Sequence, residues 1–209
     1  MSLRWALLSL VGLTLSAPAD ATTVTWRASG TVDSLIGTTA LLPLPASVGD
    51  IFDLQFSYDD ATSDVIPANP NQASYPILSL TVTIAGTALQ FVGPGSGEGH
   101  IGIQANSINP NLWGVNGCIG ACDLANYDSA RLNFFFPVDT ITSDVLTNPP
   151  DPTGATVQLG LFSRESATVE AFLVANLESV TQVPEPAAAW SMMTAIAAFA
   201  GCRRFARAR

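Results

Sequence analysis

The chain has 209 residues, a formal net charge of −9 and no lysine, so every basic side chain is an arginine. Residues 22–183 hold only three arginines but 15 of the 17 acidic residues, which gives this segment a formal charge of −12. Such an acidic surface repels phosphate backbones and argues against a nucleic-acid partner, and a single histidine excludes a zinc site built on paired histidines.

The first 21 residues have the three parts of a secretory signal peptide. Arg4 supplies the positive start, residues 5–15 form an uncharged run, and Ala19 and Ala21 are the small residues that a signal peptidase accommodates. The run is shorter than the roughly 20 apolar residues that a membrane span needs. We therefore expect export with cleavage after Ala21, so that the mature chain starts at Thr22; a buried helix or an anchor is the alternative.

From residue 22 onward apolar residues recur with period two, which is typical of strands with one buried face. The segments with this pattern are residues 22–32, 51–59, 77–86, 131–137, 154–162 and 167–180. Runs rich in Gly, Pro, Asn, Asp and Ser separate them and are read as turns and loops, including residues 107–117. The pattern predicts one all-β domain over residues 22–182, an antiparallel β-sandwich or jelly roll.

Cys118 and Cys122 are separated by three residues. In an exported chain two nearby thiols are expected to oxidise together, so we predict a structural disulfide between them. A redox pair or a metal site is the alternative. The redox motif has two intervening residues rather than three, however, and His100 alone supplies too few partners for a metal.

Asp59, Asp60 and Asp64 lie within six positions, immediately after one of the predicted strands. Carboxylates that converge in a loop bind calcium, which prefers several hard oxygen ligands. The spacing does not match an EF-hand loop, and the alternative is a solvated turn in which aspartate side chains cap backbone amides. Calcium is the one cofactor that the sequence suggests.

The sequence contains none of the short catalytic motifs that identify hydrolases, zinc proteases or phosphate-binding loops. His100 is expected on the surface or in a loop, and Trp113 either stacks on a sugar ring or plugs the core, the latter being favoured. Asp123, Asp128 and Asp139 are available to a glycoside-hydrolysing alternative, although the sequence does not show any pair facing across a cleft.

The last 27 residues combine three features. The first is a motif formed by Val183, Pro184, Glu185 and Pro186, whose prolines hold the backbone extended and end strand pairing. The second is an uncharged stretch from Ala187 to Cys202, which would reach roughly 24 Å as a helix. The third is a basic tail that would stay on the cytoplasmic side of a membrane, formed by Arg203, Arg204, Arg207 and Arg209.

This order of motif, apolar transmembrane helix and basic tail closely resembles the PEP-CTERM sorting signal of exported proteins in Gram-negative bacteria. The resemblance implies recognition by exosortase, a membrane-embedded processing enzyme, after transient residence in the inner membrane. It further implies removal of residues 183–209 and delivery to the cell surface or an exopolysaccharide matrix. A looser similarity to the bodies of such proteins covers Gly49, Asp50, Phe52, Phe56, Tyr58, Asp59 and Tyr75. A permanent C-terminal anchor or a buried amphipathic helix is the alternative for the tail.

These features together predict an exported protein with a structural or polysaccharide-associated role and no catalysis. Two alternatives from other classes stay open at this point. One is a secreted carbohydrate-active enzyme on a jelly-roll scaffold. The other is a calcium-dependent binding module centred on residues 59–64.

Overall fold

The computed structural model describes residues 22–69, 71–93, 97–105, 111–120, 127–146, 148–166 and 169–184. Within this part the chain forms ten strands, a single 3-10 helix and no α-helix. The elements are β1 (Thr23–Gly37), η1 (Thr39–Leu41), β2 (Ile51–Asp59), β3 (Gln72–Pro76), β4 (Ser79–Ile84), β5 (Thr87–Val92), β6 (Gly97–Gln104), β7 (Asn111–Ile119), β8 (Tyr127–Phe136), β9 (Thr156–Ser166) and β10 (Val169–Val183).

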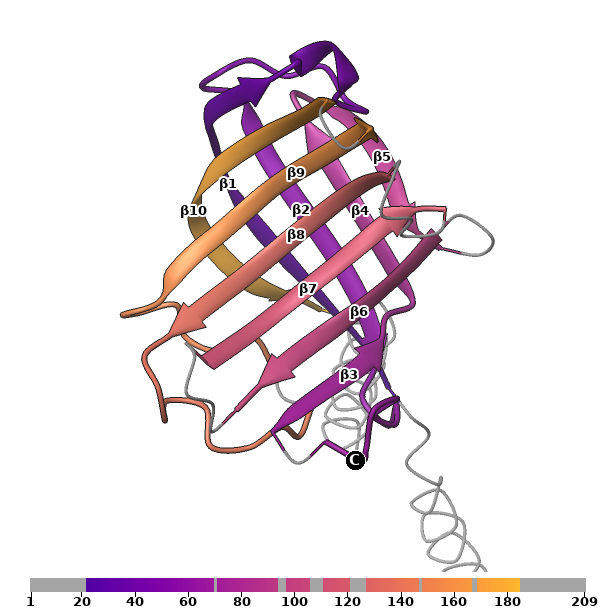
Figure 1. Ribbon diagram of the computed structural model, residues 1–209, viewed down its shortest axis with the longest axis vertical. Coiled ribbons are helices and arrows are strands. Elements are labelled where there is room, and N and C mark those ends of the chain that lie inside the picture. Colours follow the sequence, from indigo (N-terminus) through magenta and orange to yellow (C-terminus); the bar gives the residue numbers. More distant parts are fainter. Residues whose placement is uncertain are drawn as a thin grey trace, which may run out of the picture.

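All ten strands belong to one antiparallel sheet with the order β3-β6-β7-β8-β9-β10-β1-β2-β4-β5. In Figure 1, strands β6 to β9 form one wall and strands β1, β2, β4 and β5 form the wall behind it. The predicted all-β, antiparallel class is confirmed. The predicted jelly-roll sandwich is not confirmed, because a continuous hydrogen-bonded order describes one sheet curled into a half-barrel rather than two stacked sheets.

The sheet turns from one wall to the other at β1 and β10, which are its longest strands. Their pairing has two register shifts, one between Ser29 and Gly30 and one between Val32 and Ser34. Such irregularities bend a strand and increase its twist. A Cβ atom at Gly30 would lie 1.9 Å from the backbone oxygen of Asn176, so only glycine permits the close approach of the two strands at this bend.

The concave face of the sheet holds the hydrophobic core, and its residues follow the predicted alternation. In β2 the side chains of Phe52, Leu54 and Phe56 are fully buried, as the pattern of residues 51–59 predicts. Burial of each such side chain stabilises the fold by roughly 1.5–3 kcal/mol. Leu78 is an exception within the predicted segment 77–86: alternation would place it on the buried face with Leu80, but it precedes β4 and is 51% exposed.

Strand β7 occupies most of residues 107–117, which were predicted to be a loop, so that prediction is wrong. Gly114 and Gly117 suggested turns, but both lie inside the sheet. A Cβ atom at Gly117 would lie 2.6 Å from the side chains of Leu80 and Val92, and one at Gly114 would lie 2.0 Å from Oδ1 of Asn133. Neighbouring side chains thus fill the space above these glycines, which explains their presence in a strand.

Trp113, on the same strand, is 1% exposed and lies in the core. Its ring centroid is 6.1 Å from that of Phe56 and 5.9 Å from that of Phe134, so it connects the two walls of the curled sheet. This is the alternative that the sequence analysis favoured, and it leaves no ring surface for stacking on a sugar.

The two ends of the curled sheet are covered differently. At one end, a hydrogen bond holds the segment after β8 against the sheet. Tyr75 of β3 donates it to the backbone oxygen of Asp144 over 2.9 Å. At the other end η1 and the chain that follows it cover the core, with Leu44 buried. Among the described residues, this second cover leaves a pocket where β8 begins and β9 ends.

Candidate functional site

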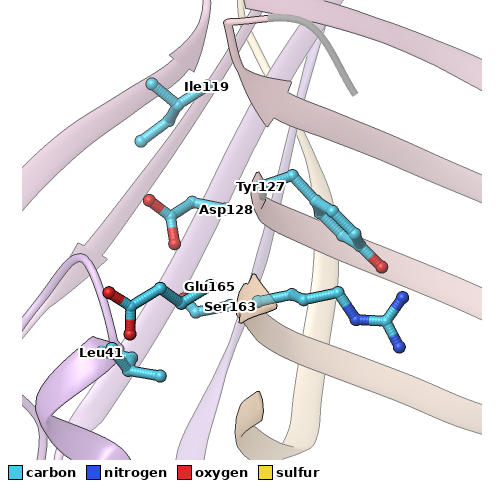
Figure 2. A pocket seen from close by; sticks show the side chains of 7 residues that line it. Leu41, Ile119, Tyr127, Asp128, Ser163 and Glu165 are labelled. Carbon is cyan, nitrogen blue, oxygen red and sulfur yellow. The ribbon is translucent and has the colours of Figure 1, made fainter. Parts of the chain in front are cut away.

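An open pocket of about 340 Å³ lies at this incompletely covered end (Figure 2). Its lining comes from η1 and from the ends of three neighbouring strands, and consists of Leu41, Ile119, Tyr127, Asp128, Ser163, Arg164 and Glu165. The volume is at the lower end of the range for small-molecule sites. It is sufficient for a small polar ligand or one end of a chain.

The register of the sheet brings three polar side chains of the pocket together. Asp128 of β8 is paired with Ser163 of β9, so their side chains lie on the same face. Glu165 follows Ser163 by two residues and therefore also lies on that face, which is the concave one. Figure 2 shows Asp128 and Glu165 pointing to the side of Ile119, whereas Tyr127 points the other way.

Ser163 is the most buried polar residue of the pocket, with 1% of its surface exposed. Its Oγ atom has no hydrogen-bond partner in the described part of the protein. A buried hydroxyl without a partner costs about 1–3 kcal/mol unless water or a ligand satisfies it. The pocket thus offers two carboxylates and a hydroxyl as hydrogen-bond partners, with apolar walls from Leu41 and Ile119.

Among these polar residues, only Asp128 was a candidate from the sequence. Ser163 and Glu165 were missed, although the alternation of residues 157–165 carries the signal. Val157, Leu159 and Leu161 alternate toward the core, and the next two positions on that face are polar. A polar residue where the pattern demands an apolar one often marks a site rather than core.

The predicted calcium ligands do not converge in the structure. Asp59 accepts a hydrogen bond from the backbone N–H two residues further on, and Asp64 accepts one from the backbone N–H of Ser74. Asp60 binds Thr22, which holds the pKa of its carboxyl below the ordinary value. No group of three or more His, Cys, Asp or Glu side chains within the described residues could hold a metal ion, so calcium gains no support.

The other predicted residues are only partly described. Cys118 is disulfide-bonded, and its predicted partner Cys122 lies outside the described residues, as does Asp123. Asp139 is an exposed turn residue with a φ of 65°. His100 lies on β6 rather than in a loop, and its side chain is exposed, although neighbouring atoms desolvate it enough to lower its pKa.

The described residues end at the beginning of the predicted sorting motif. Val183 is the last residue of β10, one residue beyond the predicted domain boundary, and it pairs with Thr25. Pro184 follows and has no N–H group with which to continue the ladder. Glu185 and Pro186, the predicted basic tail and the predicted signal-peptidase residues Ala19 and Ala21 lie outside the described residues.

The predicted membrane segment, residues 187–202, also lies outside the part that the structure describes. Within that part, no helix has the length and apolar character required to cross a membrane.

No protein-family model matches this chain, and neither a curated protein nor a solved structure matches it. Its function therefore has to be inferred from its own residues.

Proposed function

We propose that this chain is an exported β-domain protein that acts at the cell surface or in an exopolysaccharide matrix, where it associates with polysaccharide without catalysis. The N-terminal pattern would direct export, and the C-terminal pattern would place the chain in the inner membrane for exosortase-type processing. The two walls of the curled sheet would then serve as a rigid, sandwich-like scaffold outside the cell.

The observation that carries the binding role is the convergence of Asp128, Ser163 and Glu165 in one open pocket. Sugar hydroxyls are hydrogen-bond donors and acceptors, and carboxylates accept strong hydrogen bonds from them. The apolar walls suit the C–H faces of a sugar ring. The pocket opens at the end of the sheet, so the end or a bend of a polysaccharide chain can enter it without threading through the fold.

A glycan array probed with the exported protein tests this proposal. The wild type is expected to retain one class of neutral glycan, and Asp128→Asn is expected to weaken that binding at least about tenfold, because each charge-assisted hydrogen bond contributes roughly 1.5–3 kcal/mol. Asp139→Asn is the matched control, since Asp139 is an exposed turn residue outside the pocket. An array on which the wild type retains no glycan contradicts the binding role.

The pair of carboxylates also favours a second candidate function, glycoside hydrolysis. Retaining and inverting enzymes use two carboxyl groups separated by about 5–5.5 Å and 6.5–9.5 Å respectively. Asp128 and Glu165 face the same open space in Figure 2. Release of reducing ends from a bound glycan, lost in both Asp128→Asn and Glu165→Gln, would establish the enzyme, whereas intact glycan after prolonged incubation excludes it for that glycan.

A further inference from the structure

The outer, convex face of β8, β9 and β10 carries a group of side chains that we call the arginine–aromatic cluster: Tyr127, Arg131, Phe162, Arg164 and Phe172. The ring of Phe162 is at its centre, with its centroid 5.2 Å from that of Tyr127 and 4.5 Å from that of Phe172. The guanidinium carbon of Arg131 lies 5.0 Å from the same centroid, and that of Arg164 lies 5.9 Å from it. Two of the three arginines of an acidic domain therefore share one aromatic ring.

The three arginines of residues 22–183 differ in whether an acid neutralises them. Arg27 forms an ion pair with Asp53, with an N–O distance of 2.7 Å, and Arg164 forms one with Glu170. Arg131 has no carboxylate partner within the described residues. No described carboxylate neutralises the charge of Arg131, although acidic residues outnumber arginines five to one in residues 22–183.

The hydrogen-bonding capacity of Arg131 is also largely unused. Its one hydrogen bond to a described residue is a long contact of 3.4 Å from Nη2 to Oγ of Ser129, and its buried Nε atom has no partner. A guanidinium has five N–H donors in a planar fork that matches a carboxylate. Desolvation against Phe162 makes this unsatisfied cation costly, and an anion that binds its exposed edge would offset the cost.

A small dent lies beside Arg131 on the convex face, with a volume of about 40 Å³. It is located above Gly160, with Phe172 and Val174 along its edge. A Cβ atom at Gly160 would lie 1.9 Å from the backbone oxygen of Leu173, so glycine is required at this position of β9. At roughly 10–15 Å³ for each water-sized group, the dent accommodates about three non-hydrogen atoms, which is the size of a carboxylate.

We propose that this dent binds the carboxylate of an acidic sugar within an extracellular polysaccharide, with the Arg131 guanidinium as its counter-ion. The sugar ring lies along the cluster with a C–H face on Phe172, which is partly exposed. Its hydroxyls reach the neighbouring amides, where Nδ2 of Asn133 already donates to Oε1 of Gln158 over 3.3 Å. This inference rests on the proposed polysaccharide association and adds a second site, specific for an acidic sugar, on the other face of β8 and β9.

The proposal is tested by titrating the exported protein, expressed from the full-length gene, with three oligosaccharides of equal length. The probes are an oligogalacturonate, its methyl ester and a neutral glucan. The wild type is expected to bind the oligogalacturonate at least about tenfold more tightly than the methyl ester, because the ester removes only the charge that Arg131 recognises. Equal binding of the acid and the ester would overturn the proposal.

Matched variants locate the site. Arg131→Gln is expected to lose at least about tenfold in affinity for the oligogalacturonate, whereas Arg27→Gln, which makes the same change of charge on β1, is expected to stay within about twofold of wild type. If Arg131→Gln does not fold, Val174→Glu places a negative charge at the edge of the dent and is expected to abolish binding. If Arg131→Gln and Val174→Glu bind oligogalacturonate as tightly as Arg27→Gln does, the acidic sugar binds elsewhere and the proposal is wrong.

Two further arms separate this inference from its alternatives. Oligoglutamate that binds as tightly as oligogalacturonate would replace the acidic sugar with an acidic peptide and overturn the proposal. Asp139→Asn is expected to leave oligogalacturonate binding unchanged, because Asp139 is an exposed turn residue outside both the pocket and the arginine–aromatic cluster. Neutral-glycan binding without oligogalacturonate binding refutes only this inference, whereas an intracellular product refutes the proposed function itself.

Discussion

Asp128 and Ser163 are cross-strand partners on β8 and β9, and Ser163 is buried there without a hydrogen-bond partner for its hydroxyl among the described residues. Thirty-five positions of sequence separate the two residues, and only strand pairing brings them to one pocket. A buried, unpaired hydroxyl is a cost to the fold that a site tolerates when a ligand uses the group.

The first prediction follows from this unpaired hydroxyl. Ser163→Ala is expected to leave the free energy of unfolding unchanged or to raise it by about 1 kcal/mol, because an unsatisfied polar group is removed. The same change is expected to weaken glycan binding in the pocket. Denaturant unfolding and glycan titration measure the two effects, with Ser57→Ala as the control, since Ser57 shares a hydrogen bond with Ser79 and its loss should destabilise the protein. A large loss of stability in Ser163→Ala would show that the hydroxyl has a structural partner.

The second prediction concerns glycines within strands. Gly117→Ala is expected to destabilise the protein by about 1–3 kcal/mol, because the new methyl group overlaps side chains of β4 and β5. Gly102→Ala on the adjacent strand β6 is the matched control. The atom nearest to its Cβ is Cδ2 of His100 at 4.0 Å, and alanine costs less backbone entropy than glycine. Thermal unfolding of both variants compares them, and equal melting temperatures would contradict this account of β7.

The third prediction connects the signal peptide with the fold. The backbone nitrogen of Thr22 donates to Oδ1 of Asp60 over 2.9 Å, and its hydroxyl donates to Oδ2 over 2.7 Å. Cleavage after Ala21 would turn that nitrogen into an α-ammonium group, which strengthens the contact. We expect an NMR titration of the exported protein to show a raised α-amino pKa, and Asp60→Asn to return it toward the ordinary value of about 7.7–8.0.

The same contact determines a dependence of stability on pH. The pKa of Asp60 is lower in the folded protein than its ordinary value, so the stabilising contribution is complete above that ordinary value, near pH 4. It is lost as the pH falls through the lowered folded pKa. Asp60→Asn should therefore reduce the acid sensitivity of unfolding below pH 4 and leave the pH dependence of stability unchanged between pH 5 and pH 7. An unchanged acid transition would mean that the carboxylate is not held by Thr22.

The fourth prediction tests the sorting hypothesis. Replacement of Pro184, Glu185 and Pro186 by alanine should leave the apolar stretch and the basic tail able to enter the membrane, but should prevent processing. The variant is expected to accumulate at its unprocessed mass in the inner membrane, whereas the wild type is expected to lose its tail and leave the membrane. Mass spectrometry and fractionation measure both properties. Wild-type size and location in the variant would refute the role of the motif.

The alternation of apolar and polar residues predicted the strands in which this alternation is uninterrupted. Residues 51–59 were predicted as a strand with the bounds that β2 has, because Phe52, Leu54 and Phe56 alternate with polar residues without interruption. Strand β7 was missed because its glycines resemble turn residues until their neighbours on other strands are known. Among the pocket residues, Asp128 was a candidate only because it is an acid available for glycoside hydrolysis. Ser163 and Glu165 were not candidates.

The sequence by itself determined which side of each recognised strand is apolar, because side chains alternate at every residue along an extended backbone. That is enough for the all-β class and for most of the core. Only the tertiary structure decided that the ten strands form one continuous curled sheet, and that the register pairs Asp128 with Ser163 on its concave face and Arg131 with Gly160 on its convex face. The physical reason is that strand order and register depend on contacts between residues far apart in the chain, and a shift of one residue would move every side chain to the opposite face.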